Sequence, residues 1–400
     1  MDYMQSIRSA AFRGDGALRL LIVVGTRPEI IRLSAVIARC RASFDCILAH
    51  TGQNYDYNLS GIFFDELGIA PPDVYLDVAG DDLGTTLGNI ISRSYQLMAH
   101  LRPEALLVLG DTNSCLCAMA AKRLHIPIFH MEAGNRCFDE CLPEESNRRV
   151  IDTLSDVNLA YSEQARHNLL SSGAPAARTL VTGSPMAEVL RANLPRIRES
   201  DVLSRLGLQE GKYLLLSAHR EENIDNEDNF RALFGAINTL ARTYDMPVLY
   251  SCHPRSRKRL QQSGISMDAR VRLHEPLGFH DYNRLQLGAL AVISDSGTLP
   301  EEASFYAGEG TPIAAVCIRS STERPEAMEA GCFTLAGIDE QGLVRAVALA
   351  VDRRARGSCG TRVPAYADEQ VSERVVNIIA SYTGIVRRDV WHEHQGGQST

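Results

Sequence analysis

Short apolar runs alternate with longer segments of helical periodicity throughout the first half of the chain. Residues 19–25 (RLLIVVG) form an almost continuous apolar run, and residues 29–40 (EIIRLSAVIARC) follow with apolar side chains at helical spacing. Strands that alternate with helices are typical of a parallel sheet covered on both faces. The strands predicted for this half lie at residues 19–25, 45–50, 105–110, 126–132, 157–162 and 179–183.

A polar, helix-rich segment interrupts this series at residues 187–212 and is interpreted as a hinge. A second series follows, with strands predicted at residues 213–219, 246–254, 271–276, 289–296, 311–319 and 332–337. The pattern predicts the α/β class, with two doubly wound Rossmann-like domains facing a central cleft. We expect ligands in that cleft, because open parallel sheets bind them outside the carboxyl ends of their strands.

The two series set the predicted domain boundaries. They are an N-terminal extension at 1–17, an N-terminal Rossmann-like domain at 18–186, a C-terminal Rossmann-like domain at 187–370, a C-terminal helix at 371–388 and a tail at 389–400. The helix at 371–388 is expected to pack back on the N-terminal domain. A length of 400 residues suits two such domains.

The composition narrows the class of function. A hydrophobic content of 45% with 22% charged residues is that of a soluble globular protein, and no apolar run approaches the ~20 residues of a membrane span. The first 17 residues do not resemble a signal peptide, so we expect a cytoplasmic protein without membrane partners. A formal net charge of −8 argues against nucleic-acid binding. Ten cysteines without a CxxC pair indicate reduced, buried thiols rather than a metal site.

Polar residues follow the predicted strands of the first half. The segment VVGTRPE places Gly25 and Arg27 at a strand-to-helix turn, where backbone amides can approach an anion. The dinucleotide motif GxGxxG is absent, and Pro28 with Glu29 is also ordinary chemistry for a helix start. Asp111 follows another predicted strand, in LGDTNS, where it is either a functional carboxylate or a helix cap.

The second half repeats this arrangement with residues suited to phosphate. SAHREEN and SCHPRSRK each place a histidine at the end of a predicted strand, followed by an arginine, the first histidine being His219. In ISDSGTLPEEAS, Ser296 and Gly297 precede a predicted helix, whose N-terminus can bind a diphosphate, or which is simply well capped. A carboxylate one turn further, Glu302, can accept both ribose hydroxyls. These features, with Arg319 after the next strand, favour a nucleoside-diphosphate sugar.

Acidic and basic residues crowd the stretch FHMEAGNRCFDECLPEESNRRVID at 129–152. Glu132 and Arg136 lie at the end of a predicted strand and are expected to face the sugar. Glu144 and Arg148 are four residues apart, so they are predicted to share one helix face. Carboxylates near a sugar indicate proton transfer at carbon or chemistry at the glycosidic bond. Three further charged residues are expected to be solvated and dispensable: Glu140, Glu145 and Arg149.

The ordered motifs GTRPE, HTGQNYD, GDT, HMEAGNR, PEESNR, SAHREEN, HPR, SDSGTLPEE and TERPE span residues 21–331. Together they resemble the non-hydrolysing UDP-N-acetylglucosamine 2-epimerase family, of the glycosyltransferase-B type. The resemblance implies that UDP is eliminated from C1 while a base removes the C2 proton, giving a 2-acetamidoglucal. UDP then adds back with protonation on the opposite face. No metal or redox cofactor is implied, and a homodimer is expected.

The resemblance also implies a role for each matched position. The catalytic residues are Asp111, Glu132, Glu144, Arg148 and His219, of which the three carboxylates are the acid–base candidates. The substrate-binding residues are Arg27, Arg32, Gln53, Arg136, Ser296, Gly297, Glu302 and Arg319. Among them, Arg27, Ser296 and Gly297 match positions that hold the diphosphate, as His219 does, and Glu302 matches the ribose carboxylate. Gln53 lies in the region where the epimerases hold a second, activating substrate molecule.

Several positions depart from the common family pattern. Arg32 replaces a lysine, and arginine is bulkier. The segments GNRCFDE, SGT and EPLGFHDYNRLQ resemble the subgroup that makes UDP-N-acetyl-L-fucosamine from the L-pneumosamine isomer, for capsule or O-antigen. Either Phe138 or Cys137 would then pack against the methyl group of a 6-deoxy sugar. The alternative substrates are UDP-N-acetylglucosamine and UDP-N-acetyl-L-rhamnosamine.

Three other classes of protein are alternatives to a non-hydrolysing epimerase for this sequence. A UDP-sugar glycosyltransferase would need an acceptor site and would not need three carboxylates near C2. A hydrolysing epimerase would release free N-acetylmannosamine, and a sensor would not need the carboxylates at all. Solvent deuterium that appears at C2 without an acceptor distinguishes epimerisation from glycosyl transfer.

Overall fold

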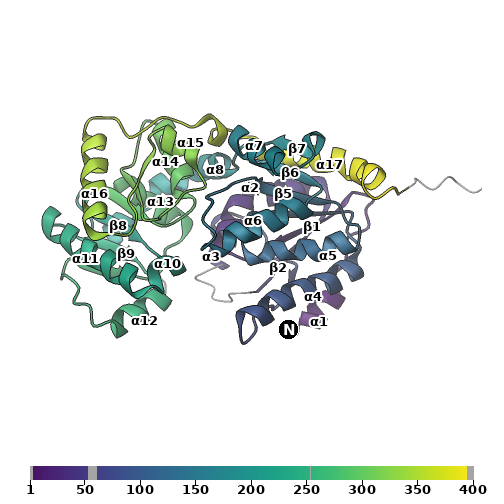
Figure 1. The fold of residues 1–400 in the computed structure, drawn as a ribbon, viewed down its shortest axis with the longest axis horizontal. Helices are drawn as coiled ribbons and strands as arrows, with labels where there is room; N and C mark the ends of the chain where they lie inside the picture. Colours follow the sequence, from purple (N-terminus) through teal and green to yellow (C-terminus); the bar gives the residue numbers. More distant parts are fainter. Residues whose placement is uncertain (1–2, 53–60, 253, 394–400) are drawn as a thin grey trace, which may run out of the picture. The chain divides into compact units, whose positions relative to one another are not determined.

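The computed structural model describes residues 3–52, 61–252 and 254–393. The chain divides into two compact units. Unit 1 comprises Met1–Val189 and Asp368–Thr400, and unit 2 comprises Leu190–Ala367. Each unit is built around its own parallel sheet (Figure 1).

Unit 1 contains a seven-stranded sheet in the order β3-β2-β1-β4-β5-β6-β7. Its strands are β1 (Arg19–Val24), β2 (Asp45–His50), β3 (Val74–Tyr75), β4 (Ala105–Leu109), β5 (Ile128–Ala133), β6 (Val157–Ala160) and β7 (Thr179–Val181). All neighbouring strands pair in parallel. The strand order reverses between β1 and β4, which makes their carboxyl ends the switch point where ligands bind in such sheets.

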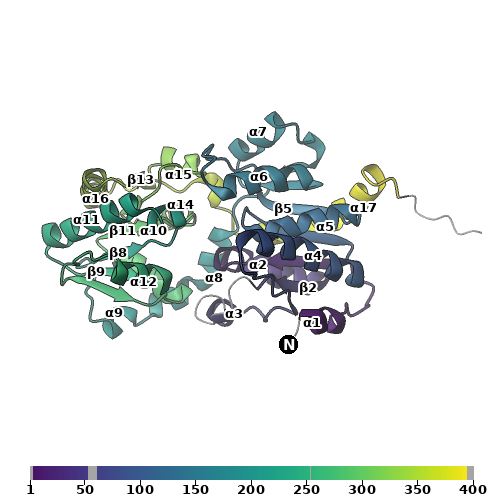
Figure 2. The same ribbon diagram turned by 60° about the horizontal axis from the view of Figure 1, so that its bottom comes forward.

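Helices cover both faces of this sheet. They are α1 (Tyr3–Ser9), α2 (Arg27–Ser43), α3 (Gly61–Glu66), α4 (Leu83–Leu101), α5 (Ala118–Arg123), α6 (Pro143–Leu154), α7 (Glu163–Ser171) and α17 (Val371–Asp389). Leu21 and Val23 of β1 pack in one core cluster with residues of α4 and α5. Leu20 and Ile22 alternate with them and are also fully buried, so they pack under the opposite layer. α17 returns from the far end of the sequence and packs against α2. It is the yellow helix of unit 1 in Figure 2.

Unit 2 repeats the arrangement with six parallel strands in the order β10-β9-β8-β11-β12-β13. The strands are β8 (Leu214–Ser217), β9 (Val248–Ser251), β10 (Val271–His274), β11 (Ala291–Ser294), β12 (Ala315–Cys317) and β13 (Phe333–Leu335). The helices are α9 (Val202–Arg205), α10 (Glu221–Ile224), α11 (Glu227–Tyr244), α12 (Pro254–Gln262), α13 (Phe279–Gly288), α14 (Leu299–Gly308), α15 (Pro325–Glu329) and α16 (Glu340–Ala355). α8 (Met186–Glu199) spans the boundary between the units. Here the strand order reverses between β8 and β11.

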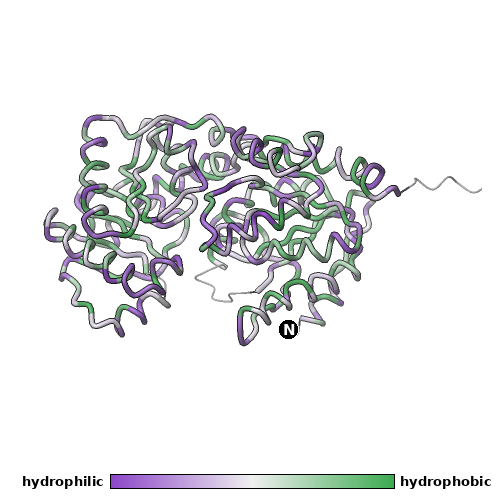
Figure 3. Tube along the Cα trace, in the orientation of Figure 1, coloured by the Kyte–Doolittle hydropathy of each residue, from purple (hydrophilic) through white to green (hydrophobic). Residues whose placement is uncertain are grey.

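The two sheets confirm the predicted α/β class with two doubly wound, Rossmann-like domains. Every predicted strand is present, although most are shorter than the apolar runs because the outer residues continue into turns. Apolar stretches gather inside each unit and polar ones on the outer helices (Figure 3). The prediction missed β3, a strand of two residues that is held by its pairing of Val74 with Ala49 of β2. Such a short strand leaves no alternating pattern in the sequence.

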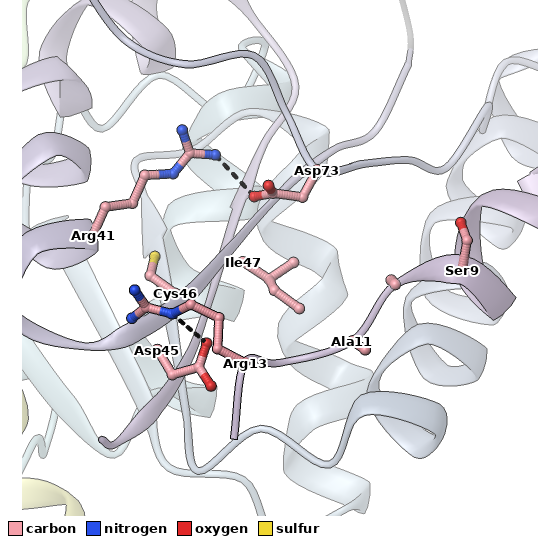
Figure 4. A pocket seen from close by; sticks show the side chains of 9 residues that line it. Ser9, Ala11, Arg13, Arg41, Asp45, Cys46, Ile47 and Asp73 are labelled. Carbon is pink, nitrogen blue, oxygen red and sulfur yellow. Dashed lines mark hydrogen bonds and ion pairs between the residues drawn. The ribbon is translucent and has the colours of Figure 1, made fainter. Parts of the chain in front are cut away.

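The N-terminal segment packs against unit 1 rather than trailing from it. α1 contacts α4 and β3, and its Ile7 is buried. Beside it lies a cavity of about 410 Å³ near the start of β2 (Figure 4). Its charged lining is neutralised internally, since Arg13 pairs with Asp45 and Arg41 pairs with Asp73. The cavity lies at the amino end of β2, away from the switch point.

In the part of the chain that the structure describes, no helix combines the length and the apolar character that a membrane span requires. All ten cysteines are free thiols, and most are buried.

Candidate active site

The loops after β1 and β4 are joined by one buried carboxylate at the switch point of unit 1. Glu29 accepts hydrogen bonds from Gly25 N at 3.1 Å, Thr26 Oγ1 at 2.8 Å and Thr112 Oγ1 at 3.0 Å, and another from Ser114 Oγ. Burial raises the pKa of the Glu29 carboxyl, and these hydrogen bonds oppose the rise. Glu29 is therefore both a helix-start residue and the link that fixes one loop against the other.

Asp111 follows β4 and is held by α6. Arg148 of α6 is buried, and its Nη2 lies 2.5 Å from Asp111 Oδ2. Asn147, one residue earlier on the same helix, donates to the backbone oxygen of Asp111 at 2.9 Å. The structure thus brings together the predicted catalytic residues Asp111 and Arg148.

Glu132 occupies an irregular position at the carboxyl end of β5. Its φ is +67°, in the left-handed region, and the register between β5 and β6 shifts between Met131 and Ala133. A β-bulge with this backbone redirects one side chain, and such strain is found preferentially at functional sites. The Glu132 carboxylate pairs with Arg32 Nη1 at 2.5 Å and accepts a hydrogen bond from Asn135 Nδ2 at 3.3 Å. Both members of the ion pair are buried.

The carboxylate of Glu132 also lies close to the loop that carries Asp111. Gly110 has a φ of +73°, and a Cβ atom there would lie 3.3 Å from Glu132 Oε2. A glycine at this position therefore serves both the turn and the close approach of the carboxylate.

The structure of α6 differs from one prediction about the charged stretch at 129–152. Glu145 was expected to be solvated, and that prediction is wrong: it is 1% exposed, and its Oε2 lies 3.0 Å from Arg148 Nη1. The physical reason is that side chains three apart on a helix also share a face, so Glu145 lies beside Arg148. Glu144 is only half-buried, whereas Glu140 and Arg149 are exposed as predicted.

Arg136 lies in a different group from Arg148. Its Nη1 pairs with Asp152 Oδ2 at 2.7 Å and donates to the backbone oxygen of Asn135 at 2.8 Å. His130 Nδ1 lies 3.0 Å from the same Asp152. These contacts place Arg136 in a buried cluster under β5, apart from the pair formed by Arg148 with Asp111.

The loop after Arg136 presents an unusual pair of side chains. Phe138 is 71% exposed and has a φ of +57°. Cys137 is half-buried, and burial raises the pKa of its thiol. Arg27, at the start of α2, is partly buried with its guanidinium 5.8 Å from the ring centre of Phe63. Gln53 lies outside the described residues.

The switch point of unit 2 carries His219 after β8 and Asp295 after β11. His219 Nδ1 lies 2.9 Å from Asp295 Oδ1, while Asp295 Oδ2 accepts from the backbone N–H groups of His219 and Arg220 at 2.9 Å. Asn223 Nδ2 donates to the same oxygen at 3.0 Å. Burial alone would raise the pKa of Asp295, but the charge of His219 and these hydrogen bonds outweigh it and hold the pKa well below its usual range.

Ser296 and Gly297 lie partly exposed at the N-terminus of α14, an arrangement that suits an anion. Behind them, Glu302 is buried and accepts from Thr298 Oγ1 at 2.9 Å and from Gln286 Nε2 at 2.8 Å. The predicted diphosphate and ribose groups therefore share one helix start.

Arg319 lies in the turn after β12 and is 2% exposed. Its Nη1 lies 2.7 Å from Glu323 Oε2. Burial alone would lower the pKa of Arg319, but the charge of Glu323 outweighs it and raises the pKa, so the side chain is a permanent cation. Its Nε and Nη2 have no hydrogen-bond partner among the described residues. Buried guanidinium N–H groups of this kind suit a ligand oxygen.

A family model described as UDP-N-acetylglucosamine 2-epimerase matches residues 38–380. The chain belongs to this family. Among solved structures, UDP-N-acetylglucosamine 2-epimerase from Rickettsia bellii is 40% identical, with a TM-score of 0.86 over 94% of this chain and 100% of that chain. The UDP-GlcNAc 2-epimerase of Methanocaldococcus jannaschii, in complex with UDP-GlcNAc and UDP, is 30% identical, with a TM-score of 0.84 over 91% and 99% of the two chains.

A third relative shows that the family is not confined to one sugar. UDP-2,3-diacetamido-2,3-dideoxy-D-glucuronate 2-epimerase from Pseudomonas aeruginosa is 32% identical over 374 residues, which are 91% of this chain and 99% of that one. The comparisons confirm the family predicted from the motifs, and the epimerase is an isomerase that acts on a UDP-sugar.

Three buried carboxylates of this epimerase were not selected from its sequence. The sequence pattern marks Glu29 as a helix-start residue, places Asp295 at the end of a predicted strand, and predicts a solvated side chain for Glu145. A signal existed for Asp295, because an aspartate directly after an apolar strand at a predicted switch point is well placed to orient a neighbour. For Glu145 the signal was its spacing of three from Arg148.

Proposed function

We propose that this epimerase interconverts UDP-N-acetyl-L-pneumosamine and UDP-N-acetyl-L-fucosamine for capsule or O-antigen synthesis. It does so as a homodimer in the cytoplasm. The departures from the common family sequence at GNRCFDE, SGT and EPLGFHDYNRLQ support this choice of sugar.

Inversion at C2 by elimination and re-addition of UDP needs two proton-transfer groups that reach C2 from opposite faces. The observation that carries the proposal is that Asp111 and Glu132 lie at the carboxyl ends of neighbouring strands, β4 and β5, and that each is paired with its own arginine. Glu144, half-buried at the start of α6, is the third acid–base candidate.

In unit 2, we assign His219, Arg319 and the start of α14 to the diphosphate. Negative charge grows on the diphosphate as its bond to C1 breaks, so cationic side chains and helix amides there stabilise the transition state. Glu302 serves the ribose. This assignment is supported by the Nε and Nη2 groups of Arg319, which have no hydrogen-bond partner within residues 3–52, 61–252 and 254–393, and by the partial exposure of Ser296 and Gly297.

Substitution of the carboxylates tests the catalytic assignment. We expect Asp111→Asn and Glu132→Gln each to slow C2 exchange in deuterium oxide by about 10²- to 10⁴-fold, the usual range for general acid–base groups. Glu140→Gln is the matched control, because Glu140 lies in the same stretch with its side chain 78% exposed. Exchange at the wild-type rate in both variants would contradict the assignment.

The choice of sugar is tested by offering each UDP-sugar separately in deuterium oxide and following product and C2 deuterium by NMR. We expect turnover of the 6-deoxy-L-hexosamine pair. The second candidate is UDP-N-acetylglucosamine, which is favoured by the 40% identity to the Rickettsia bellii enzyme of that name. Turnover of UDP-N-acetylglucosamine alone would refute the fucosamine proposal and leave 2-epimerisation intact.

Phe138 offers a specific test of 6-deoxy selectivity. Its 71% exposure leaves the ring accessible to the methyl group of a ligand. Burial of one methyl-sized group stabilises by about 0.8 kcal/mol, which is about 4-fold in kcat/KM. We expect Phe138→Ala to lower the preference for the 6-deoxy sugar by about that factor. Leu83→Ala, at a side chain that is also exposed, is the control. An unchanged preference would exclude Phe138 from sugar recognition.

A further inference from the structure

We infer that Glu145 is a positioning residue, which holds the guanidinium of Arg148 against Asp111 together with the thiol of Cys137. The inference rests on the proposed function, in which Asp111 transfers a proton at C2. It assigns a role to a side chain that the sequence motifs did not single out.

The guanidinium of Arg148 has contacts on two sides. Its Nη2 lies 2.5 Å from Asp111 Oδ2, and its Nη1 lies 3.0 Å from Glu145 Oε2. Nη1 also lies 3.3 Å from Cys137 Sγ. The guanidinium group is planar and rigid, so contacts at both terminal nitrogens fix the direction in which it faces Asp111.

Glu145 is itself held from several sides. Its Oε2 accepts hydrogen bonds from Cys137 N at 3.2 Å and from Cys137 Sγ at 3.3 Å. Arg149 Nη2 lies 3.6 Å from its Oε1. The residue is 1% exposed, so water does not compete for these contacts. A buried carboxylate with this set of partners is preorganised and does not need to move when substrate arrives.

This arrangement also explains why the carboxylate is not itself the proton-transfer group. Three donors converge on Oε2, two from Cys137 and one from Arg148. The action of Glu145 on the substrate therefore passes through Arg148 and Asp111. Removing Glu145 should lower kcat and leave KM nearly unchanged, because the substitution leaves the residues that are assigned to the diphosphate and the ribose in place.

The first test uses Glu145→Ala, with Glu140→Ala as the matched control. We expect Glu145→Ala to lower kcat and the rate of C2 deuterium exchange about 10-fold, with KM within 2-fold of wild type. Glu145→Gln retains an oxygen for the same donors and should recover kcat to within about 3-fold of wild type. Wild-type kcat in Glu145→Ala would overturn the inference.

A double-mutant cycle separates positioning from general support of the fold. In an Arg148→Gln background, Glu145→Ala should cause no further loss of kcat, because it acts through an arginine that is no longer present. An equal loss in both backgrounds would show that Glu145 only supports the fold. If Glu145→Ala fails to fold, Cys137→Ala removes one member of the same contact and should lower kcat about 3-fold; unchanged kcat there would overturn the role of the thiol.

A crystal structure of Glu145→Ala keeps this inference separate from the proposed function. We expect Arg148 to have left Asp111 in that variant. If it still pairs with Asp111 as in wild type, the inference fails whichever sugar is the substrate. If wild type exchanges deuterium at C2 of none of the UDP-sugars, the proposed function fails, while the position of Arg148 in the variant still decides the role of Glu145.

Discussion

Asp295→Asn is the substitution in unit 2 whose effect can be worked out most fully from the structure. The carboxylate is completely buried and gathers three N–H donors on one oxygen, from His219 N, Arg220 N and Asn223 Nδ2. Its other oxygen lies 2.9 Å from His219 Nδ1. Asparagine has the same shape but no charge, and it replaces one acceptor by an NH₂ donor.

The loss of charge determines how far the free energy of unfolding is expected to fall. A hydrogen bond to a charged group contributes about 1 kcal/mol more than one between neutral groups. For three donors the free energy of unfolding at pH 7 should fall by about 3 kcal/mol. The NH₂ group would also face His219 Nδ1 and favour the opposite tautomer of the imidazole, so affinity for UDP should fall as well.

The dependence on pH gives an independent check with a definite sign. The pKa of Asp295 in the folded protein lies well below its usual range, so the unfolded chain binds this proton first as the pH falls. The stabilisation is complete above about pH 4, near the ordinary aspartate pKa. It is lost as the pH falls toward the folded-state pKa. The difference in stability between wild type and Asp295→Asn should therefore shrink below pH 4.

Denaturant unfolding of the full chain between pH 2.5 and pH 7 measures the loss of unfolding free energy and its dependence on pH. Calorimetric titration with UDP measures the loss of affinity. Asp245→Asn is the matched control, because Asp245 is 89% exposed in the side chain and has a φ of +48°, which asparagine tolerates. A change in unfolding free energy below about 0.5 kcal/mol at pH 7, the usual range for surface substitutions, would refute the reasoning.

Three further outcomes follow from unit 1. Arg32→Met leaves the buried carboxylate of Glu132 without its cation, so thermal unfolding should show a loss of about 3–5 kcal/mol, and Arg32→Lys should lose much less. Gly110→Ala places a Cβ atom 3.3 Å from Glu132 Oε2 at a φ of +73°, so we expect a loss of about 1–2 kcal/mol together with slower C2 exchange; wild-type values for both would contradict the close approach. Burial lowers the pKa of His50 from 6.5 to about 4, so its NMR titration should show a neutral ring at pH 6. Because the unfolded chain is protonated first, His50 should reduce stability progressively as the pH falls from about 6.5 toward 4, by up to about 3 kcal/mol.

The sequence predicted the fold well because its strands are buried on both faces. Such strands appear as continuous apolar runs, and β1, β4 and β8 each stand out in this way. Strand β3 was not predicted, because two residues are too few to show an alternating pattern and because the strand forms only by pairing with β2. Most predicted strands include turn residues at their ends. Apolar character alone does not show where the hydrogen bonds between neighbouring strands stop.

The candidate site was predictable at strand ends and less so within helices. Asp111, His219 and Ser296 follow strands, and the switch-point rule locates such positions without a structure. The partners of these residues depend on how a helix is rotated on the sheet. Glu144 and Glu145 are adjacent in the sequence, yet only Glu145 is buried beside Arg148. Residues three or four apart on a helix share a face, so the sequence allows either Glu144 or Glu145 to be buried with Arg148. Only the packing of α6 decides between them.

The packing of α17 on α2 has a consequence for how the protein is made. Unit 2 is inserted within unit 1, and Asp389, the last residue of α17, lies 200 positions after Val189 in the sequence. At ~5–20 residues per second, a ribosome needs roughly 10–40 s to synthesise that length. During this interval the whole of unit 2 emerges before α2 receives its partner. Unit 2 can therefore complete its folding first, whereas unit 1 can complete its folding only after α17 has been synthesised.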